Sequence, residues 1–239
     1  MPDYLQRTEN RINEESRESV RIERLQRVTG FNFRNKRHFV VGAGTGGLAV
    51  VLYKEYDGLV YGIEPNEAAI SIIRKKCKTF GMNPNNFKRE PCEQISFEDN
   101  SFDYVHCFTV LEHVRDVEKS IDEMIRITKP GGKIYINTPN YADPYEGHYK
   151  ILFPTFLPKI FGKLYLISIG KSTELLNTIN FITEKKMNRI LSKKKNITWL
   201  RIYEPGKRTK GILGLFLDWI TFSQFVYKNQ EIVIVKMSK

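Results

Sequence analysis

The stretch FVVGAGTGGLAVV, residues 39–51, decides the fold, because an apolar run enters a burst of glycines and then becomes apolar again. Glycine tolerates positive φ and lets the backbone approach a ligand with no side chain between them. A helix that begins at such a turn offers free N–H groups and a positive dipole end. Gly42, Gly44 and Gly47 fit a dinucleotide site, whereas Gly42, Gly44 and Gly46 fit a methyl-donor site, so the turn alone leaves both open.

Strand and helix patterns alternate on both sides of this turn. We predict strands over 38–42, 59–63, 102–108, 133–138, 196–203 and 230–237, and helices over 9–29, 46–56, 66–80, 116–128 and 183–194. This alternation predicts an α/β fold, a mostly parallel sheet with helices on both faces. Ligands of such sheets bind at the carboxyl ends of the strands, where the glycine turn, Glu64 and the loop after Phe108 fall.

Composition and pattern divide the chain into three parts within one folded unit. An N-terminal helix occupies 1–30, a cofactor-binding core 31–140, and a C-terminal part 141–239 that carries insertions at 141–180 and 205–227 over the ligand edge. The chain is 41% hydrophobic and 27% charged, as folded proteins commonly are. Its three cysteines lack metal-binding spacing, so we predict free thiols, a reducing cytoplasm and no metal. No secretory signal is visible.

Positive charge gathers in the last hundred residues. The net charge is +11, and residues 141–239 contribute +10 of it. Such a surface attracts anionic partners, or it is simply a lysine-rich solvated face. The segment GILGLFLDWITFSQFV, residues 211–226, is too short to span a membrane and follows Lys207, Arg208 and Lys210. It can lie on a membrane face, line an apolar acceptor pocket or pack as a buried helix, so peripheral membrane contact stays open.

The sequence downstream of the glycine turn resembles that of a known protein family. SFDYVHCFTVLEHV, residues 101–114, followed by DEMIRITKPGGKIYINTPN, residues 122–140, closely resembles the class I S-adenosylmethionine-dependent methyltransferases. The resemblance runs from about Phe39 to Asn140, and it is to the branch that methylates small molecules, quinones and sugar- or lipid-linked substrates. It implies a Rossmann-like sheet of seven strands and S-adenosyl-L-methionine as cofactor.

The resemblance also implies which residues bind the cofactor. The implied set surrounds the methionine part, the ribose, the adenine and the sulfonium in turn: Gly42, Ala43, Gly44 and Gly46; Glu64; Pro65, Asn66, Cys92 and Glu93; Phe108 and Thr109. Two positions depart from the family pattern. Val40 stands where an acid usually precedes the glycines, and Pro91 stands where an aspartate commonly faces the adenine amine. These departures weaken the expected grip on the methionine amine and on the adenine.

Methyl transfer to a hydroxyl needs an acceptor held in line and benefits from a general base. Four side chains near the strand ends are candidates, namely Glu112, His113, Glu146 and His148. We prefer His148 as the base, with Glu146 orienting it or binding a substrate hydroxyl. Structural alternatives are that Glu112 and His113 brace their loop and that residues 145–149 form a surface turn. Asn140, Tyr141 and Tyr145 are the predicted substrate-binding residues.

The predicted reaction is methyl transfer to an oxygen of a small or a lipid- or sugar-linked acceptor. A nucleic-acid methyltransferase is disfavoured, because FTVLEH, residues 108–113, lacks an Asn/Asp-Pro-Pro-aromatic motif and no RNA-binding module is recognisable. A nicotinamide oxidoreductase fits the glycine turn but not the sequence that follows it. A non-catalytic binding protein on the same fold stays open because of Val40 and Pro91. The sequence leaves the oligomeric state open.

Overall fold

A computed structural model describes residues 14–143, 145–153, 155, 158–203, 208–209 and 226–238. Its centre is a seven-stranded sheet in the order β3-β2-β1-β4-β5-β11-β8. The strands are β1 (Arg37–Val41), β2 (Leu59–Ile63), β3 (Phe87–Lys88), β4 (Phe102–Phe108), β5 (Thr128–Pro139), β8 (Ile197–Ile202) and β11 (Asn229–Lys236). All neighbours pair in parallel except β11, which runs antiparallel to both β5 and β8.

This sheet confirms the predicted α/β class and its mostly parallel order. Each predicted strand is present, although β5 begins at Thr128 and so includes the Lys-Pro-Gly-Gly stretch that the sequence placed in a turn. The sequence missed β3, which has two residues and follows a 3-10 turn at Pro84–Asn86. A strand this short has no alternation of side chains for a pattern to detect.

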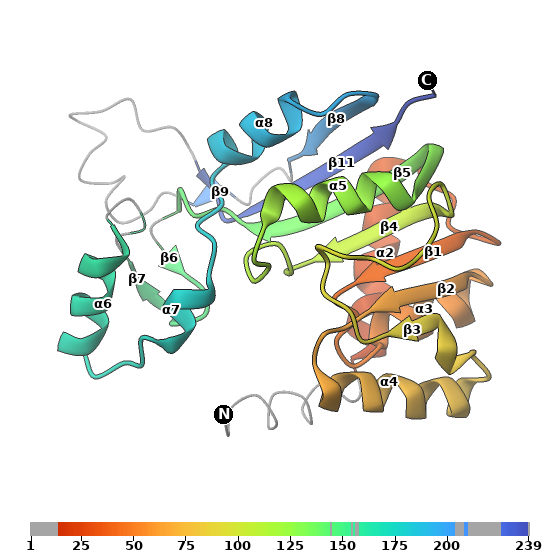
Figure 1. The fold of residues 1–239 in the computed structure, drawn as a ribbon, viewed down its shortest axis with the longest axis horizontal. Coiled ribbons are helices and arrows are strands. Elements are labelled where there is room, and N and C mark those ends of the chain that lie inside the picture. The colour runs from red at the N-terminus through yellow and green to blue at the C-terminus, as the bar shows by residue number, and fades with distance from the viewer. Residues whose placement is uncertain are drawn as a thin grey trace.

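Helices cover both faces of the sheet (Figure 1). On one face lie α2 (Glu15–Thr29), α3 (Gly47–Tyr56) and α4 (Glu67–Phe80), whose apolar side chains share one core cluster. On the other face lie α5 (Val117–Ile127) and α8 (Glu184–Ser192), which share a second cluster. Asn66 caps α4 by accepting a hydrogen bond from the Ala69 N–H at 3.1 Å, and Gly81 ends it, as predicted.

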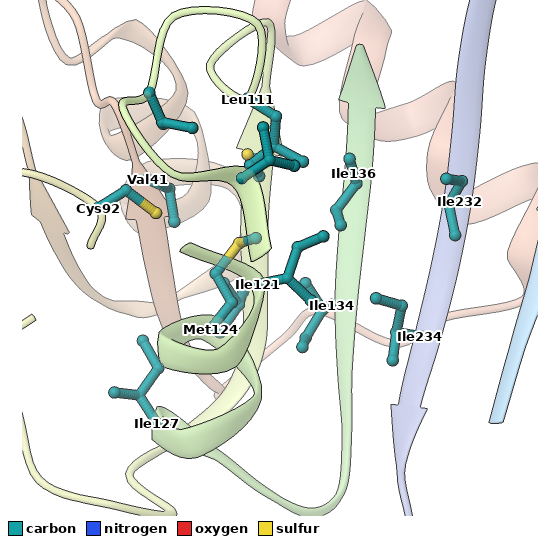
Figure 2. Packing of buried hydrophobic residues seen from close by; sticks show 14 of the residues in the cluster. Val41, Cys92, Leu111, Ile121, Met124, Ile127, Ile134, Ile136, Ile232 and Ile234 are labelled. Atoms are coloured by element: carbon teal, nitrogen blue, oxygen red, sulfur yellow. The ribbon is translucent and has the colours of Figure 1, made fainter. Parts of the chain in front are cut away.

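The packing of α5 on the sheet shows why this pattern folds as it does. Figure 2 shows Ile121 and Met124 of α5 beside Ile134 and Ile136 of β5, with Ile232 of β11 farther along the sheet. All five side chains are fully buried. Burial of a side chain of this size contributes roughly 1.5–3 kcal/mol, so this face anchors the strands whose ends form the site.

The segment after β5 forms a small lobe beside the sheet (Figure 1). It contains the antiparallel pair β6 (Tyr145–Glu146) and β7 (Ile151–Leu152), then α6 (Lys159–Ser168) and α7 (Glu174–Thr178). Phe153, Leu166 and Leu176 are its buried core. Because the lobe begins where β5 ends, it is attached at the ligand edge, where the sequence placed an insertion.

Other parts of the sequence predictions fall outside the described residues. These include residues 9–13 of the N-terminal helix and most of the 211–226 segment, of which only Val226 is described, in strand β10 (Val226–Tyr227) paired with β9 (Arg208–Thr209). None of the helices in the described ranges is both long and apolar enough to cross a bilayer.

Two buried histidines lie side by side on the central strands. His38 Nδ1 is 3.1 Å from His106 Nε2, and His38 Nε2 is 2.9 Å from the Phe33 carbonyl oxygen. The carbonyl can only accept, so His38 donates from Nε2 and accepts at Nδ1 from the N–H of His106. The pair is therefore bonded as two neutral imidazoles. Burial lowers the pKa of His38 to about 4, and burial followed by the charge of His38 lowers that of His106.

We expect acid to destabilise the protein through this pair. The unfolded chain takes up protons near pH 6.5 while folded His38 stays neutral, so stability is full above that pH and falls as pH drops towards about 4. His38 alone accounts for about 3 kcal/mol at the lower end of this window. Urea unfolding at pH 7 and pH 4.5 measures the loss. Titration of folded His38 near pH 6.5 by NMR would contradict the expectation.

Candidate active site

A cavity of about 460 Å³ opens at the carboxyl ends of β1, β2 and β4. β1 lies between β2 and β4, so the cavity occupies the point where the strand order reverses. Its lining residues come from the glycine turn, the end of β2, the loop after β4 and helix α2: Val40, Val41, Gly42, Ala43, Gly44, Leu48, Glu64, Pro65, Asn66, Phe108, Thr109, Val110, His113, Glu14, Arg17, Glu18 and Arg21.

The glycine turn holds three residues in the left-handed region. Gly42, Gly44 and Gly46 have φ of 61°, 57° and 86°. A Cβ on Gly42 would lie 2.5 Å from Val110 Cγ2, so this glycine allows close packing of the loop after β4. A Cβ on Gly44 would meet nothing within 4 Å, so its backbone faces open space in the cavity. The first glycine therefore serves packing, and the second leaves room for a ligand.

Glu64 at the end of β2 is fixed by backbone donors. Its Oε2 accepts from the Gly44 N–H and its Oε1 from the Asn66 N–H, each at 2.9 Å. The side chain is only 7% exposed, and both Glu64 and its neighbour Pro65 line the cavity. A carboxylate oxygen can accept more than one hydrogen bond, so Glu64 is an acceptor of the kind that binds the hydroxyl groups of a ligand.

Two of the predicted adenine residues lie outside the cavity lining. Cys92 is buried in the hydrophobic core, where its Sγ donates to the Ser120 carbonyl oxygen at 3.9 Å and burial raises its pKa to about 12. Glu93 turns the other way, and its carboxylate accepts the backbone N–H groups of Arg115 and Asp116. Both side chains are thus committed to structure, and nothing in the sequence separated that role from ligand binding.

The loop after β4 brings a histidine to the cavity wall. Phe108, Thr109 and His113 line it, and Thr109 has the unusual φ of 53°. The ring of His113 packs edge-on against that of His148, with centroids 5.0 Å apart. Burial, followed by repulsion from His148, lowers the pKa of His113 to about 4, so it is neutral at physiological pH.

The lobe contributes a carboxylate–imidazole pair beside His113. Glu146 Oε1 lies 2.7 Å from His148 Nδ1, and Glu146 Oε2 accepts the Tyr149 N–H at 2.7 Å. Burial raises the pKa of Glu146, but the hydrogen bonds from His148 and Tyr149 outweigh it and bring the pKa below the ordinary value. Glu146 is therefore a buried carboxylate that holds the imidazole by one nitrogen.

Glu112 and Tyr141 complete this cluster. Glu112 Oε2 accepts the Thr138 hydroxyl at 3.1 Å, whereas Oε1 is buried with no hydrogen-bond partner among the described residues. Burial raises the pKa of Glu112 to about 7. Burial, followed by the charges of Glu146 and Glu112, raises the pKa of Tyr141, whose hydroxyl has no hydrogen-bond partner among the described residues.

The predicted substrate residues divide between the interior and the surface. Asn140 and Tyr141 are buried, and Asn140 Oδ1 accepts the Ala142 N–H at 3.1 Å, which shapes the start of the lobe. Tyr145 is 44% exposed and has Lys228 Nζ 5.5 Å from its ring centroid. Asn140 and Tyr141 are thus part of the interior, whereas Tyr145 lies at the surface.

Within the described residues, one group could hold a metal ion. Glu112, His113 and His148 each offer a ligand atom, and these atoms lie within 4.8 Å of one another. One carboxylate and two imidazoles form a ligand set that suits zinc or another transition metal. The same side chains equally make a proton-transfer cluster, so the two roles need a separating experiment.

Helix α2 is the part of the site that the sequence did not reveal. Glu14, Arg17, Glu18 and Arg21 recur at helical spacing and all line the cavity. The same charges fit an ordinary solvated helix face, and only the packing of α2 on α3 shows where they point. The absence of an acid at position 40, where Val40 stands, was the available signal that another element supplies a carboxylate here.

Comparisons with known proteins agree with this geometry. Residues 39–136 match the family described as methyltransferase domain. The demethylmenaquinone methyltransferase of Bacteroides fragilis is 30% identical over 157 residues, which are 61% of this chain and 64% of that protein. Over these residues the chain is thus similar to S-adenosylmethionine-dependent methyltransferases, whose fold it shares. The matched region spans under two thirds of the relative's length.

Solved structures share the fold of this chain at low identity. Haemonchus contortus phosphoethanolamine N-methyltransferase 2, solved with S-adenosylhomocysteine, has a TM-score of 0.57 at 18% identity, covering 90% of this chain and 51% of that one. The [4+2]-cyclase SpnF has a TM-score of 0.58 at 13% identity, covering 92% and 82%. The fold thus serves a cyclase as well, so the reaction has to be argued from the site.

The cavity fits the cofactor of this family. The open side of Gly44 leaves room beside the glycine turn. Next to it, at the end of β2, Glu64 presents a carboxylate fixed by the Gly44 N–H. The family's donor, S-adenosylmethionine, has a ribose with two hydroxyls for Glu64 and an amino-acid part for the turn. Val40 supplies no carboxylate, and among the described residues of the cavity lining the acids besides Glu64 are Glu14 and Glu18, at the start of α2.

Proposed function

We propose that this methyltransferase transfers a methyl group to an oxygen of a small or lipid-linked acceptor, with His148 as the general base. The observation that carries the proposal is the 2.7 Å pair of Glu146 and His148, which contacts His113 on the cavity wall. This chain of side chains connects the lobe to the cofactor cavity. It provides a proton acceptor close to where an acceptor molecule meets the methyl group.

Glu146 sets the chemistry of the base. As a carboxylate it accepts the Nδ1–H of His148, which selects the tautomer that receives a proton at Nε2. S-adenosylmethionine supplies a methyl group on a positively charged sulfur. As the acceptor oxygen bonds to that methyl carbon, the carbon–sulfur bond breaks, the thioether leaves with the bonding pair, and the hydroxyl proton moves to His148. Neutral His113 and the apolar Val110 help to exclude water from this step.

A lipid-linked acceptor is supported by the surface of α6. Ile160, Phe161, Leu164 and Ile167 are between 52% and 64% exposed on this helix. Residues 158–172 contain three lysines and no acid. An apolar face with basic flanks suits an anionic membrane, where a lipid-linked acceptor is found. The relative's name, demethylmenaquinone methyltransferase, indicates an acceptor of this class.

We expect the protein to sediment with vesicles that contain anionic phospholipid. The double variant Phe161→Ser/Leu164→Ser should bind them about tenfold more weakly, because two large apolar side chains no longer enter the interface. Leu200→Ser is the matched control, since Leu200 is 55% exposed on β8, far along the sheet. Equal losses in both variants, or binding to neutral vesicles alone, would contradict a docking role for α6.

The test of the proposed function is transfer of labelled methyl from S-adenosylmethionine to a reduced demethylnaphthoquinone and to simpler phenols. NMR of the product then shows whether the methyl group lies on oxygen or on carbon. A methoxy product supports the proposal, and a carbon-bound methyl group overturns the choice of atom. Tight cofactor binding without transfer to any hydroxyl acceptor would favour the non-catalytic alternative.

We expect transfer to continue after treatment with a strong chelator, because His148 acts here as a base. Added Zn²⁺ should inhibit, since Glu112, His113 and His148 would be drawn together as ligands. The measurement is the initial rate with chelator, with Zn²⁺ and with chelator followed by Mg²⁺. If the chelator abolished activity and a metal restored it, the cluster would be a metal site and His148 a ligand.

A further inference from the structure

Helix α2 carries a charged stripe on the cavity wall. Arg17 Nη2 and Arg21 Nη1 contact Glu18 Oε1 and Oε2 at 3.0 and 2.6 Å. Glu18 is only 3% exposed, which is rare for an acid unless a charged partner accompanies it. The two arginines pair with this carboxylate at the cavity wall and fix its direction.

Two further contacts tie the stripe to the rest of the cavity. Glu14 Oε1 accepts from the Thr45 hydroxyl at 2.7 Å and from the Gly47 N–H at 3.2 Å, where α3 begins. At the other end, Arg21 Cζ lies 4.7 Å from the centre of the Phe108 ring. Helix α2 therefore spans the cavity from the glycine turn to the loop after β4.

We propose that α2 binds the amino-acid part of the cofactor, with Glu18 accepting its ammonium group and Arg21 donating to its carboxylate. That part is a zwitterion, and a site for it needs one anion and one cation a few ångströms apart. Glu18 and Arg21 are such a pair. Glu64 accepts the N–H groups of Gly44 and Asn66 at the end of β2, which assigns it to the ribose and leaves the amino-acid part to α2.

This assignment explains the valine at position 40. β1 provides no carboxylate at its end, because Val40 is buried in the core cluster that also contains Ile22 and Leu25 of α2. Because Ile22 and Leu25 of α2 share a core cluster with Val40, the same helix holds Glu18 at the cavity, where it supplies the carboxylate that β1 lacks. Oε1 of Glu18 accepts two hydrogen bonds from Arg17, whereas Oε2 accepts one from Arg21 and can accept a second from the ammonium group.

The experiment compares two ligands that differ only in the proposed contact. S-adenosylhomocysteine has the amino-acid part, and 5′-methylthioadenosine lacks it. In calorimetric titration of the full chain, Glu18→Gln and Arg21→Gln should each raise the dissociation constant of S-adenosylhomocysteine about 10- to 100-fold. This is the effect of losing one charged hydrogen bond. The dissociation constant of 5′-methylthioadenosine should change less than about threefold. Decarboxylated S-adenosylhomocysteine should respond to Glu18→Gln but not to Arg21→Gln.

The control is Glu23→Gln, an exposed acid on the same helix outside the cavity lining, which should leave both ligands unchanged. Thermal melting of each variant establishes that it is folded. If the variants weakened the binding of both ligands equally, α2 would stabilise the cavity without contacting the amino-acid part. If S-adenosylhomocysteine bound as before, α2 would have no role in binding the cofactor. Because binding is measured without an acceptor, either result is independent of whether His148 is the base.

Discussion

His148→Gln is expected to lower the single-turnover rate of methyl transfer by about 10²- to 10⁴-fold, the usual contribution of a positioned general base. Glutamine keeps a polar side chain of similar reach but cannot take up the acceptor's proton. Binding of S-adenosylmethionine should be unchanged, because His148 is not among the residues that line the cofactor cavity. Rapid quench with labelled cofactor measures the chemical step, and calorimetry measures the binding.

The variant His113→Gln tests whether His113, instead of His148, is the general base. Both histidines belong to one cluster, but His113 has a pKa of about 4 and is a weak base at neutral pH. We expect His113→Gln to lower the rate of methyl transfer much less than His148→Gln does. Glu146→Gln should lower the rate by an intermediate amount. An amide still holds the ring of His148 but no longer stabilises its protonated form. A large loss for His113→Gln with near-normal His148→Gln would transfer the role of base to His113.

The sheet and the cofactor turn could be predicted because each follows from local pattern. Strands alternate with helices along the sequence, the glycines mark one turn, and Glu64 follows the next strand. The fold confirms these elements, and Glu64 accepts a hydrogen bond from the Gly44 N–H at the cavity wall. Sequence spacing also placed Glu146 near His148, where two residues of separation in a short hairpin allow contact.

The remaining site residues depend on packing that no short pattern records. Cys92 and Glu93 occupy neighbouring positions, yet one enters the core and the other accepts backbone N–H groups. The stripe from Glu14 to Arg21 has the composition of a solvated helix face. It lines a cavity only because Ile22 and Leu25, on another side of α2, pack into the core with α3. Tertiary docking therefore decides which charges bind a ligand.

Glu64→Gln is expected to raise the dissociation constant of S-adenosylmethionine about 100-fold. The carboxylate accepts two backbone N–H groups at 2.9 Å, and its acceptor oxygens at the end of β2 are the kind of group that binds ribose hydroxyls. An amide at this position has one acceptor oxygen, and its NH₂ group faces either a backbone donor or a ribose hydroxyl. Loss of one or two charged hydrogen bonds corresponds to this change in affinity. Calorimetric titration of the folded variant measures it.

Glu67→Gln is the matched control, because Glu67 is a nearby exposed acid that pairs with Arg89 and does not line the cavity. NAD is the control ligand, since the glycine spacing by itself also fits a dinucleotide. We expect micromolar binding of S-adenosylmethionine by the unaltered protein and by Glu67→Gln, and no binding of NAD by either. If Glu64→Gln bound the cofactor normally, Glu64 would serve only to join the glycine turn to α4. The ribose would then need another acceptor, and among the described residues that line the cavity the remaining acids are those of α2.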